Sequence, residues 1–385
     1  MDNLFKIQTG NLTISNPIVL SAMAGITDGK FAKSNAESAG LVVLGAFNLD
    51  EESQAAGEET ISRGRTEFTA NEADEDVFAR IEKEIDFVQK EMPKTIVAVS
   101  VRSSTLEPLL KAAALLKSKN SILELDVHCR QPEFTERGMG QALLKETEKL
   151  AETIRKIKET GVILSVKFRT NIVNPAVAAE FFDAAGADII HADAMIEKKG
   201  ADYEAIAEIR NATRKIIIAN NSVDEFEAAL EFFTCGADLV SVARASTDSK
   251  FIPHLVEKIS EYQKENGWYN APKHVCKHGD NRGLTFCCPP VKYCGLLKKI
   301  EEVGFTPDEF IQLKQESVKG TPLADGKETC FGSLVWCCKG SKPCYYRDGT
   351  LAQLGIPKTE YMKMKKDLSE KILNAIEKKK SVSSN

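Results

Sequence analysis

The chain has 385 residues, of which 43% are hydrophobic and 28% charged, proportions that are ordinary for a soluble globular protein. This length allows a folded body of ~250 residues with an appendage. No basic segment followed by an apolar one opens the chain, and no stretch approaches the ~18 apolar residues of a membrane span. We therefore expect a cytoplasmic protein rather than a secreted or membrane protein.

The net charge of −5 is unevenly distributed along the chain. From residue 251 onward there are 22 Lys and Arg against 16 Asp and Glu. Because the whole chain has 51 basic and 56 acidic residues, residues 1–250 carry a balance of −11. An acidic body is a poor surface for nucleic acid, so any RNA partner is expected at the basic tail.

Eight apolar runs rich in β-branched residues follow one another through residues 1–250, as expected for strands that are buried on both faces. They are 18–23, 41–47, 95–101, 122–127, 162–168, 187–193, 215–220 and 237–243. Amphipathic stretches lie between them, among them 141–159 and 223–234, the latter with Ser222 as a candidate N-cap. The pattern predicts a (β/α)8 TIM barrel, with an open doubly wound sheet as the alternative. Residues 5–15 are expected to form a β-hairpin ahead of it.

Eight of the ten cysteines fall into two similar quartets in the C-terminal third. Each quartet ends in the pattern aromatic, Cys-Cys, three residues, Lys, one residue, Cys. The quartets are Cys276, Cys287, Cys288 and Cys294, and then Cys330, Cys337, Cys338 and Cys344. Four thiolates are the ligand set of one tetrahedral zinc ion or one iron–sulfur cluster, and a reducing cytoplasm argues against disulfides. His274 and His278 are alternative ligands. Since neither quartet has the C-x2-C spacing typical of zinc, both metals stay open.

These features divide the chain into three predicted parts. Residues 1–265 form the barrel, residues 271–350 a small Cys-rich metal-binding module, and residues 351–385 a basic helix with a disordered tail. The helix is expected over 356–380. The module has too little apolar material to fold alone, so bound metal would stabilise it.

Barrel enzymes place their active sites at the carboxyl ends of the strands, and polar residues gather at those ends here. The first strand ends in Met23, Ala24 and Gly25, and later strands end near Ser100, Cys129, Lys167 and His191. The last two strands end in Asn220 and Asn221, and in Ala243 and Arg244.

Six segments in this order resemble the flavin-dependent tRNA-dihydrouridine synthases. They are NPIVLSAMAGITDGKFA, ELDVHC, RGMGQALLK, SVKFR, GADIIH and IIIANNSVDEFEAAL. The resemblance implies an FMN-dependent oxidoreductase that reduces a pyrimidine C=C bond, in tRNA uridine or in a small molecule. The two cysteine quartets are similar to the methanogenesis marker protein 9 family, which implies an archaeal, anaerobic host and a protein partner in a methanogenic process.

The resemblance also implies roles for single residues. Cys129 would be the proton donor, with His128, Arg130 and Arg137 favouring its thiolate form. The FMN-binding residues would be Met23, Ala24, Gly25, Ser100, Lys167, His191, Asn220, Asn221, Ala243 and Arg244. Lys167 would face the electron-rich edge of the flavin, and the residues that end the last two strands would hold its phosphate.

Several family positions are altered, and they support a second interpretation. Asn221 and Ala243 stand where glycines would let the backbone approach a phosphate, and a Cβ there narrows the cup. Asp126 replaces an asparagine and Arg130 a proline beside Cys129. The alternative is a non-catalytic metal-binding assembly or regulatory protein of methanogenic archaea, built on a decayed flavin barrel.

Overall fold

A computed structural model of the chain describes residues 7–65, 76–213, 215–266, 300–326, 333–336 and 345–383. The chain forms two compact units. The barrel unit consists of Lys6–Phe232 and Ala237–Glu257. The C-terminal unit consists of Met1–Phe5, Phe233–Gly236 and Lys258–Asn385.

The barrel unit contains the predicted closed ring of eight parallel strands. In ring order they are β11 (Ile216–Asn220), β12 (Leu239–Val242), β3 (Ile18–Leu20), β4 (Leu41–Asn48), β5 (Ile96–Arg102), β6 (Ile122–Val127), β7 (Ile163–Arg169) and β8 (Ile189–Asp193). All eight predicted runs are strands, and the parallel register continues around the ring. The (β/α)8 barrel is therefore confirmed.

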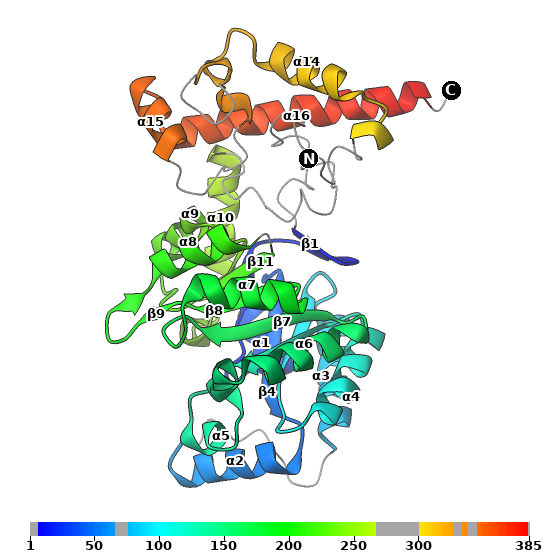
Figure 1. Cartoon of the computed structure of the whole chain (residues 1–385), viewed down its shortest axis with the longest axis vertical. Helices are drawn as coiled ribbons and strands as arrows, with labels where there is room; N and C mark the ends of the chain where they lie inside the picture. Colours follow the sequence, from blue (N-terminus) through cyan, green and yellow to red (C-terminus); the bar gives the residue numbers. More distant parts are fainter. Residues whose placement is uncertain are drawn as a thin grey trace. The chain divides into compact units, whose positions relative to one another are not determined.

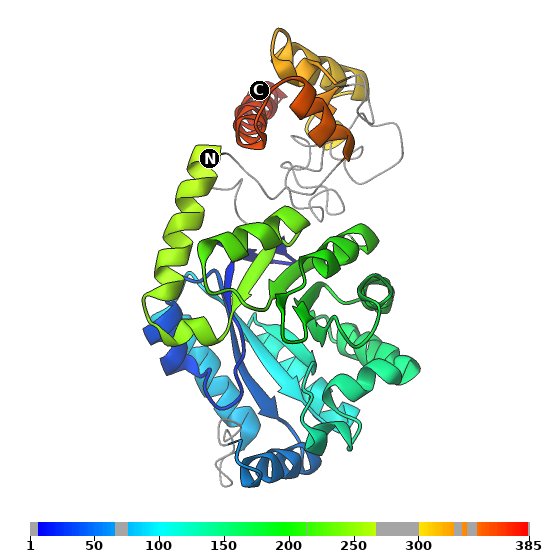
Figure 2. The same ribbon diagram turned by 90° about the vertical axis from the view of Figure 1, so that its left-hand side faces the viewer.

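Helices surround the ring of strands (Figures 1 and 2). In chain order they are α1 (Gly29–Ala36), α2 (Glu51–Ser62), α3 (Val77–Glu91), α4 (Leu106–Ser118), α5 (Pro132–Thr135), the 3-10 helix η3 (Gly140–Lys145), α6 (Thr147–Glu159), α7 (Pro175–Ala185), α8 (Tyr203–Ala212), α9 (Phe226–Cys235), the 3-10 helix η4 (Arg244–Thr247) and α10 (Phe251–Asn266). A short ribbon, β9 (Met195–Ile196) and β10 (Gly200–Ala201), follows β8.

The predicted N-terminal hairpin is present as β1 (Ile7–Thr9) and β2 (Leu12–Ile14), which pair antiparallel. Its side chains Ile7, Leu12 and Ile14 are buried in one apolar cluster with residues near the starts of the barrel strands, among them Val19 and Ile122. Each such buried side chain stabilises the fold by about 1.5–3 kcal/mol relative to an exposed one. Because this cluster closes the amino-terminal end, polar chemistry is left to the opposite end.

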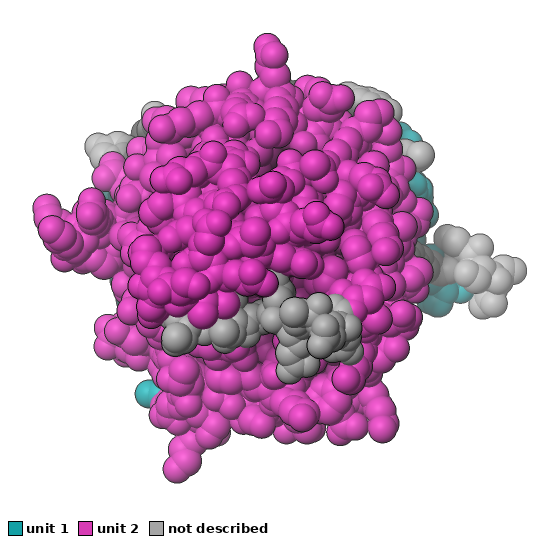
Figure 3. All heavy atoms as spheres, turned by 90° about the horizontal axis from the view of Figure 1, so that it is seen from below, with its two compact units in different colours: residues 1–5, 233–236, 258–385 teal, residues 6–232, 237–257 magenta. Residues whose placement is uncertain are grey.

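The opposite end is where α2 and α5 begin, just after β4 and β6 finish (Figure 1). Figure 3 views the barrel unit onto this end. The helix α2 is fixed there by a capping box, in which Asp50 accepts from the backbone N–H of Ser53. Asp50 also accepts hydrogen bonds from Ser103 and Ser104 beyond β5. These contacts tie two neighbouring loops of the carboxyl face together.

Two helices differ from the sequence prediction. The stretch 141–159 is not one helix, because η3 ends at Lys145 and α6 begins at Thr147. The helix expected over 223–234 begins only at Phe226, and Ser222 does not cap it. Ser222 has a backbone φ of +49° and donates its hydroxyl to Asn221, so it belongs to the turn that follows β11.

The described part of the C-terminal unit is helical. It contains α14 (Pro307–Val318), the 3-10 helices η5 (Pro322–Ala324) and η6 (Leu334–Trp336), α15 (Tyr345–Gln353) and α16 (Lys358–Ser383). The helix expected over 356–380 is α16, which extends to Ser383, into the stretch for which we expected no structure. Among the described residues no helix is long and apolar enough to cross a membrane.

Candidate active site

Two adjoining cavities lie at the carboxyl ends of the barrel strands. The first has a volume of about 490 Å³ and is lined from β3, β5, β6 and β7, with Cys129 in its wall. The second has a volume of about 580 Å³ and lies at the ends of β8, β11 and β12. The cavities share five lining residues, which are Ala22, His128, Lys167, Arg169 and Arg244. They therefore form one crevice across the face of the barrel.

The end of β3 contributes a fixed turn to the first cavity. Met23 and Ala24 line that cavity, whereas Gly25 does not. The carbonyl of Met23 accepts from the backbone N–H groups of Ile26 and Thr27, and the N–H of Met23 donates to the Thr27 hydroxyl at 3.0 Å. Gly25 has a φ of +74°, a conformation that glycine adopts without strain. The turn thus presents a narrow surface to the crevice.

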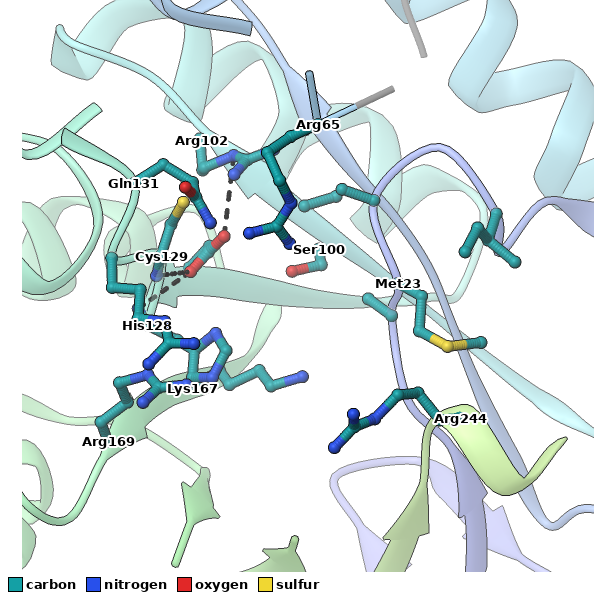
Figure 4. Close-up of a pocket in the computed structure, with 16 residues that line it drawn as sticks. Met23, Arg65, Ser100, Arg102, His128, Cys129, Gln131, Lys167, Arg169 and Arg244 are labelled. Carbon is teal, nitrogen blue, oxygen red and sulfur yellow. Dashed lines mark hydrogen bonds and ion pairs between the residues drawn. The ribbon is translucent and has the colours of Figure 1, made fainter. Parts of the chain in front are cut away.

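Lys167 reaches the crevice from inside the barrel. Its side chain is buried, and its Nζ donates to the Ser21 hydroxyl at 2.8 Å. In Figure 4 this ammonium group points to the middle of the first cavity, opposite the guanidinium of Arg244. Two cations from β7 and from the end of β12 therefore face the same space.

Beneath Lys167 lies a buried polar chain that the sequence did not predict. His191 is fully buried and joins the Glu124 carboxylate (Nδ1 to Oε2, 2.7 Å) to the Ser241 hydroxyl (Nε2 to Oγ, 2.8 Å). Burial lowers the pKa of His191, because the interior disfavours the charged imidazolium. Burial opposes ionisation of Glu124 too, but His191, Lys167 and Ser100 outweigh it and lower its pKa to about 2.

This arrangement bears on the expected flavin contact of His191. The imidazole lines neither cavity, so the structure does not bring it to the crevice with the other candidates. His191 instead lies beneath the crevice and holds Glu124 and Ser241 in place through its two ring nitrogens. Ser100 does line the first cavity, as expected for a residue near the cofactor.

The second cavity holds the residues expected at the flavin phosphate. Asn220, Asn221, Ala243 and Arg244 all line it. Asn220 is anchored by a hydrogen bond from its side chain to the Ser241 hydroxyl at 2.7 Å. Asn221 has a φ of +120°, the glycine-like conformation that is strained for a residue with a Cβ. Such strained positions gather at functional sites.

Cys129 is held in a defined backbone position after β6. The Asp126 carboxylate accepts from the N–H groups of His128 and Cys129 at 2.8 and 2.9 Å. Gly140, with a φ of +59°, packs so closely that an added Cβ would lie 2.3 Å from the Cys129 carbonyl oxygen. The side chain of Cys129 packs with Ala56, Phe134 and Met139, and in Figure 4 its sulfur lies beside Gln131.

The thiol of Cys129 is kept in its protonated form. Burial raises the pKa of Cys129, and the Asp126 charge adds to this, while Arg102 opposes it. The expectation that His128, Arg130 and Arg137 make the thiolate the favoured form was wrong, because the pKa is raised; the Arg137 guanidinium pairs with Glu52 and Glu59 instead. Arg102, at the end of β5, lowers the pKa of the thiol, and Arg169 also interacts with it electrostatically.

The sequence interpretation also missed two further residues of the site. Glu124 faces the barrel interior, and only the alternation along β6 could have indicated it. Arg65 lines the first cavity from the end of α2, where no strand pattern marks it, and its guanidinium points into the cavity (Figure 4).

The eight cysteines of the two quartets lie outside the described residues, as do His274 and His278. In the part of the chain that the structure does describe, no group of three or more His, Cys, Asp or Glu is placed to hold a metal ion. Cys129 and Cys235, which are described, are in no disulfide, and both are buried.

The crevice fits an FMN molecule. A cavity of about 580 Å³ remains beside Ala243, so the residues that replace the glycines leave room for a phosphate group. Lys167 and Arg244 line both cavities with positive charge, which suits an anionic cofactor, and Met23 and Ala24 line the first cavity beside them.

Comparison with known proteins identifies related chains. The family model for dihydrouridine synthase matches residues 70–281. Two uncharacterized proteins of Methanocaldococcus jannaschii are similar, one 55% identical over 28% of this chain and 69% of the relative, the other 32% identical over 66% of this chain and 96% of the relative. A Helicobacter pylori protein named probable tRNA-dihydrouridine synthase is 28% identical over 34% of this chain and 43% of its own length.

Proposed function

Because this chain belongs to the dihydrouridine synthase family, we propose that it is an FMN-dependent oxidoreductase that reduces the C=C bond of a pyrimidine-type substrate. Uridine in tRNA is the family's substrate and the first candidate. The observation that carries the proposal is that Cys129, Lys167 and the Met23 turn line one cavity. In this proposal Cys129 is the proton donor, Lys167 is the cation beside the flavin, and the Met23 turn lies against the flavin ring.

In the proposed reaction Cys129, Arg102 and Asp126 have different roles. Reduced FMN, when bound, supplies a hydride to one carbon of the double bond. Cys129 gives its proton to the other carbon, so the double bond becomes a single bond and the thiol a thiolate. The raised pKa keeps the thiol protonated before the reaction, and Arg102 stabilises the thiolate that forms. Asp126 holds the loop in place through two backbone N–H groups.

Incubation of unmodified tRNA or free uridine with the protein and chemically reduced FMN tests this reaction. Dihydrouridine, measured by mass spectrometry, is expected with the wild type and is expected to fall by about 100-fold or more in Cys129→Ala, within the range of about 10²–10⁴ for loss of a general acid. Cys235→Ala is the matched control, because this second buried thiol lies in α9, away from the crevice residues. Equal loss in both variants would contradict the assigned role.

We also propose that the cysteine quartets bind metal, either zinc or an iron–sulfur cluster, in a module spanning 271–350. Two buried lysines support this. Lys365 donates to the carbonyl of Val335 at 3.0 Å, and the Nζ of Lys314 lies 5.1 Å from the Trp336 ring centre. Both ammonium groups thus lie near the residues that directly precede Cys337. Thiolate-bound metal centres carry negative charge that buried cations stabilise.

Metal analysis of protein purified without oxygen tests the metal proposal. Iron with sulfide and broad visible absorbance would identify a cluster, and zinc without absorbance would identify a zinc site. Replacing Cys337 and Cys338 by serine is expected to reduce the metal content. Unchanged metal content in this variant would overturn the proposal that the cysteine quartets bind metal. The link to a methanogenic process and to a protein partner remains a prediction from the resemblance of this module.

A further inference from the structure

The side chain of His128 stands where the two cavities of the crevice meet. His128 is one of the five residues that line both cavities, and 28% of its side chain is exposed. It follows the last residue of β6 and directly precedes Cys129 in the chain. In Figure 4 His128 and Cys129 lie on the same side of the first cavity, opposite Met23 and Arg244. A molecule bound against this side of the cavity would meet both side chains.

One ring nitrogen of His128 is bonded to a buried carboxylate. The Nε2 of His128 lies 2.7 Å from the Oδ2 of Asp193, a side chain at the end of β8 that is only 5% exposed. Burial opposes ionisation of Asp193, but hydrogen bonds from His128 and Asn221 and the charge of Arg169 outweigh it and lower the pKa of Asp193. Because an ionised carboxylate only accepts hydrogen bonds, the Nε2 of His128 must carry the proton.

Both oxygens of Asp193 also have partners other than His128. The side chain of Asn221 donates to Oδ1 at 2.8 Å, and the guanidinium of Arg169 lies 3.2 Å from Oδ2. Since Arg169 already balances the negative charge of Asp193, the imidazole of His128 can stay neutral. In a neutral ring with its proton on Nε2, the other nitrogen, Nδ1, is a hydrogen-bond acceptor. Among the residues that the structure describes, none donates to this Nδ1.

We infer that Nδ1 of His128 accepts a hydrogen bond from a ring N–H of the substrate, and that the crevice thereby selects pyrimidines of the uracil type. This inference rests on the proposed function, in which the pyrimidine lies between the flavin and Cys129. Uracil carries such an N–H between its two carbonyl groups, whereas cytosine has an unprotonated nitrogen at the same ring position. Two acceptors that face each other stay unpaired, so a site built around an acceptor rejects the cytosine ring.

Asp193 is the positioning residue in this arrangement. A free imidazole carries its proton on either nitrogen, and the form with the proton on Nδ1 would oppose a ring N–H of the substrate. The hydrogen bond from His128 to Asp193 selects the other form. Because Asp193 is itself held by Arg169 and Asn221, the imidazole is oriented by contacts from the ends of β7, β8 and β11.

Ligand binding to the FMN-loaded protein tests the inference. The probes are 1-methyluracil, which keeps the ring N–H, and 1-methylcytosine and 1,3-dimethyluracil, which both lack it; the change in flavin absorbance reports binding. The wild type is expected to bind 1-methyluracil about 10-fold more tightly than either of the other two, as for one hydrogen bond.

Variants of the pair assign this preference to its source. His128→Ala should bind the three probes alike. His128→Gln should keep part of the preference, because an amide group can donate to Asp193 and still offer an oxygen as acceptor. Asp193→Asn should weaken the preference, because the asparagine amide can donate to Nε2 and so allow the proton to move to Nδ1.

Controls separate the possible outcomes. His254→Gln changes an exposed histidine of α10 that lines neither cavity, and it should leave the preference unchanged. Equal binding of the three probes by the wild type, a preference that survives in His128→Ala, or an equal loss in His254→Gln would overturn the inference. An FMN-loaded protein that binds none of the probes would overturn it too.

Calorimetry on FMN-free protein distinguishes this inference from the proposed function. If the protein takes up no FMN but still prefers 1-methyluracil, and this preference depends on His128, the flavin proposal falls and the inference stands. If it takes up neither FMN nor 1-methyluracil, both fall.

Discussion

The Nε of Arg102 lies 3.6 Å from the Oδ2 of Asp126, and both side chains are buried. The other carboxylate oxygen of Asp126 accepts the backbone N–H of Cys129. The pair therefore sets both the position of the thiol and the charge around it: Arg102 lowers the pKa of Cys129 and Asp126 raises it.

Asp126→Asn separates these two effects. The amide oxygen can still accept the backbone N–H groups, but the negative charge is lost. Because that charge raises the pKa of Cys129, the pKa is expected to fall in the variant. The protonated thiol is the reactive form, so the rate falls as the pH rises through the pKa of Cys129. In Asp126→Asn this fall in rate should begin at a lower pH than in the wild type. The pH profile of kcat/KM checks this, and a shift to higher pH would contradict it.

Gly140→Ala tests the fixed backbone at Cys129. The new Cβ would lie 2.3 Å from the Cys129 carbonyl oxygen, so the loop must move. Gly138→Ala is a matched control, because Gly138 also has a positive φ, of +70°, but its nearest neighbour is the Glu146 side chain at 3.4 Å. Both variants should lose about 1–2 kcal/mol of folding stability, because alanine adopts the left-handed backbone less readily than glycine. Only Gly140→Ala should also lower kcat, and equal kcat values in the two variants would contradict this.

Lys167→Met tests the cation at the flavin. Removing the ammonium group should weaken FMN binding and make the flavin harder to reduce, because the negative charge of the reduced ring loses its partner. We expect a reduction potential lower by roughly 30 mV, equivalent to about 1.4 kcal/mol for two electrons. Lys167→Arg, which keeps the charge, should restore part of the shift. Spectroelectrochemistry measures it, and an unchanged potential in Lys167→Met would place the lysine elsewhere.

Glu124→Gln tests the buried polar chain through the pH dependence of stability. The pKa of Glu124 is lowered from 4.5 to about 2 in the folded protein. Its ionised form therefore stabilises the fold above pH 4.5, and this contribution is lost as pH falls from 4.5 to 2. Urea unfolding across this range should show a shallower loss of stability in the variant than in the wild type. Parallel curves would show that the carboxylate is not ionised in the fold.

The sequence predicted the barrel well because each strand is a continuous apolar run. It predicted the strand-end residues for the same reason, since parallel strands bring their carboxyl ends to one face. The contact between His191 and Glu124 could not be read from it. Such contacts depend on the register of the closed ring, in which Lys167 pairs with His191 and Glu124 with Ser165.

Asn221 shows a different limit. The sequence indicated that a residue with a Cβ replaces a glycine there, and we expected a narrower cup. The structure shows that Asn221 adopts the glycine-like backbone itself and that its side chain donates to Asp193 at 2.8 Å. A tertiary hydrogen bond to the end of β8 thus accompanies a backbone conformation that residue type alone argues against.

Titration of the protein with FMN, followed through the flavin absorbance without oxygen, tests the central claim most directly. The account predicts saturation at one FMN per chain, no uptake in Ala243→Phe, whose ring would occupy the space beside residue 243 where the phosphate is expected, and normal uptake in Lys156→Gln, on the surface of α6. Absence of FMN uptake by the wild type, or uptake that Ala243→Phe leaves unchanged, would contradict it.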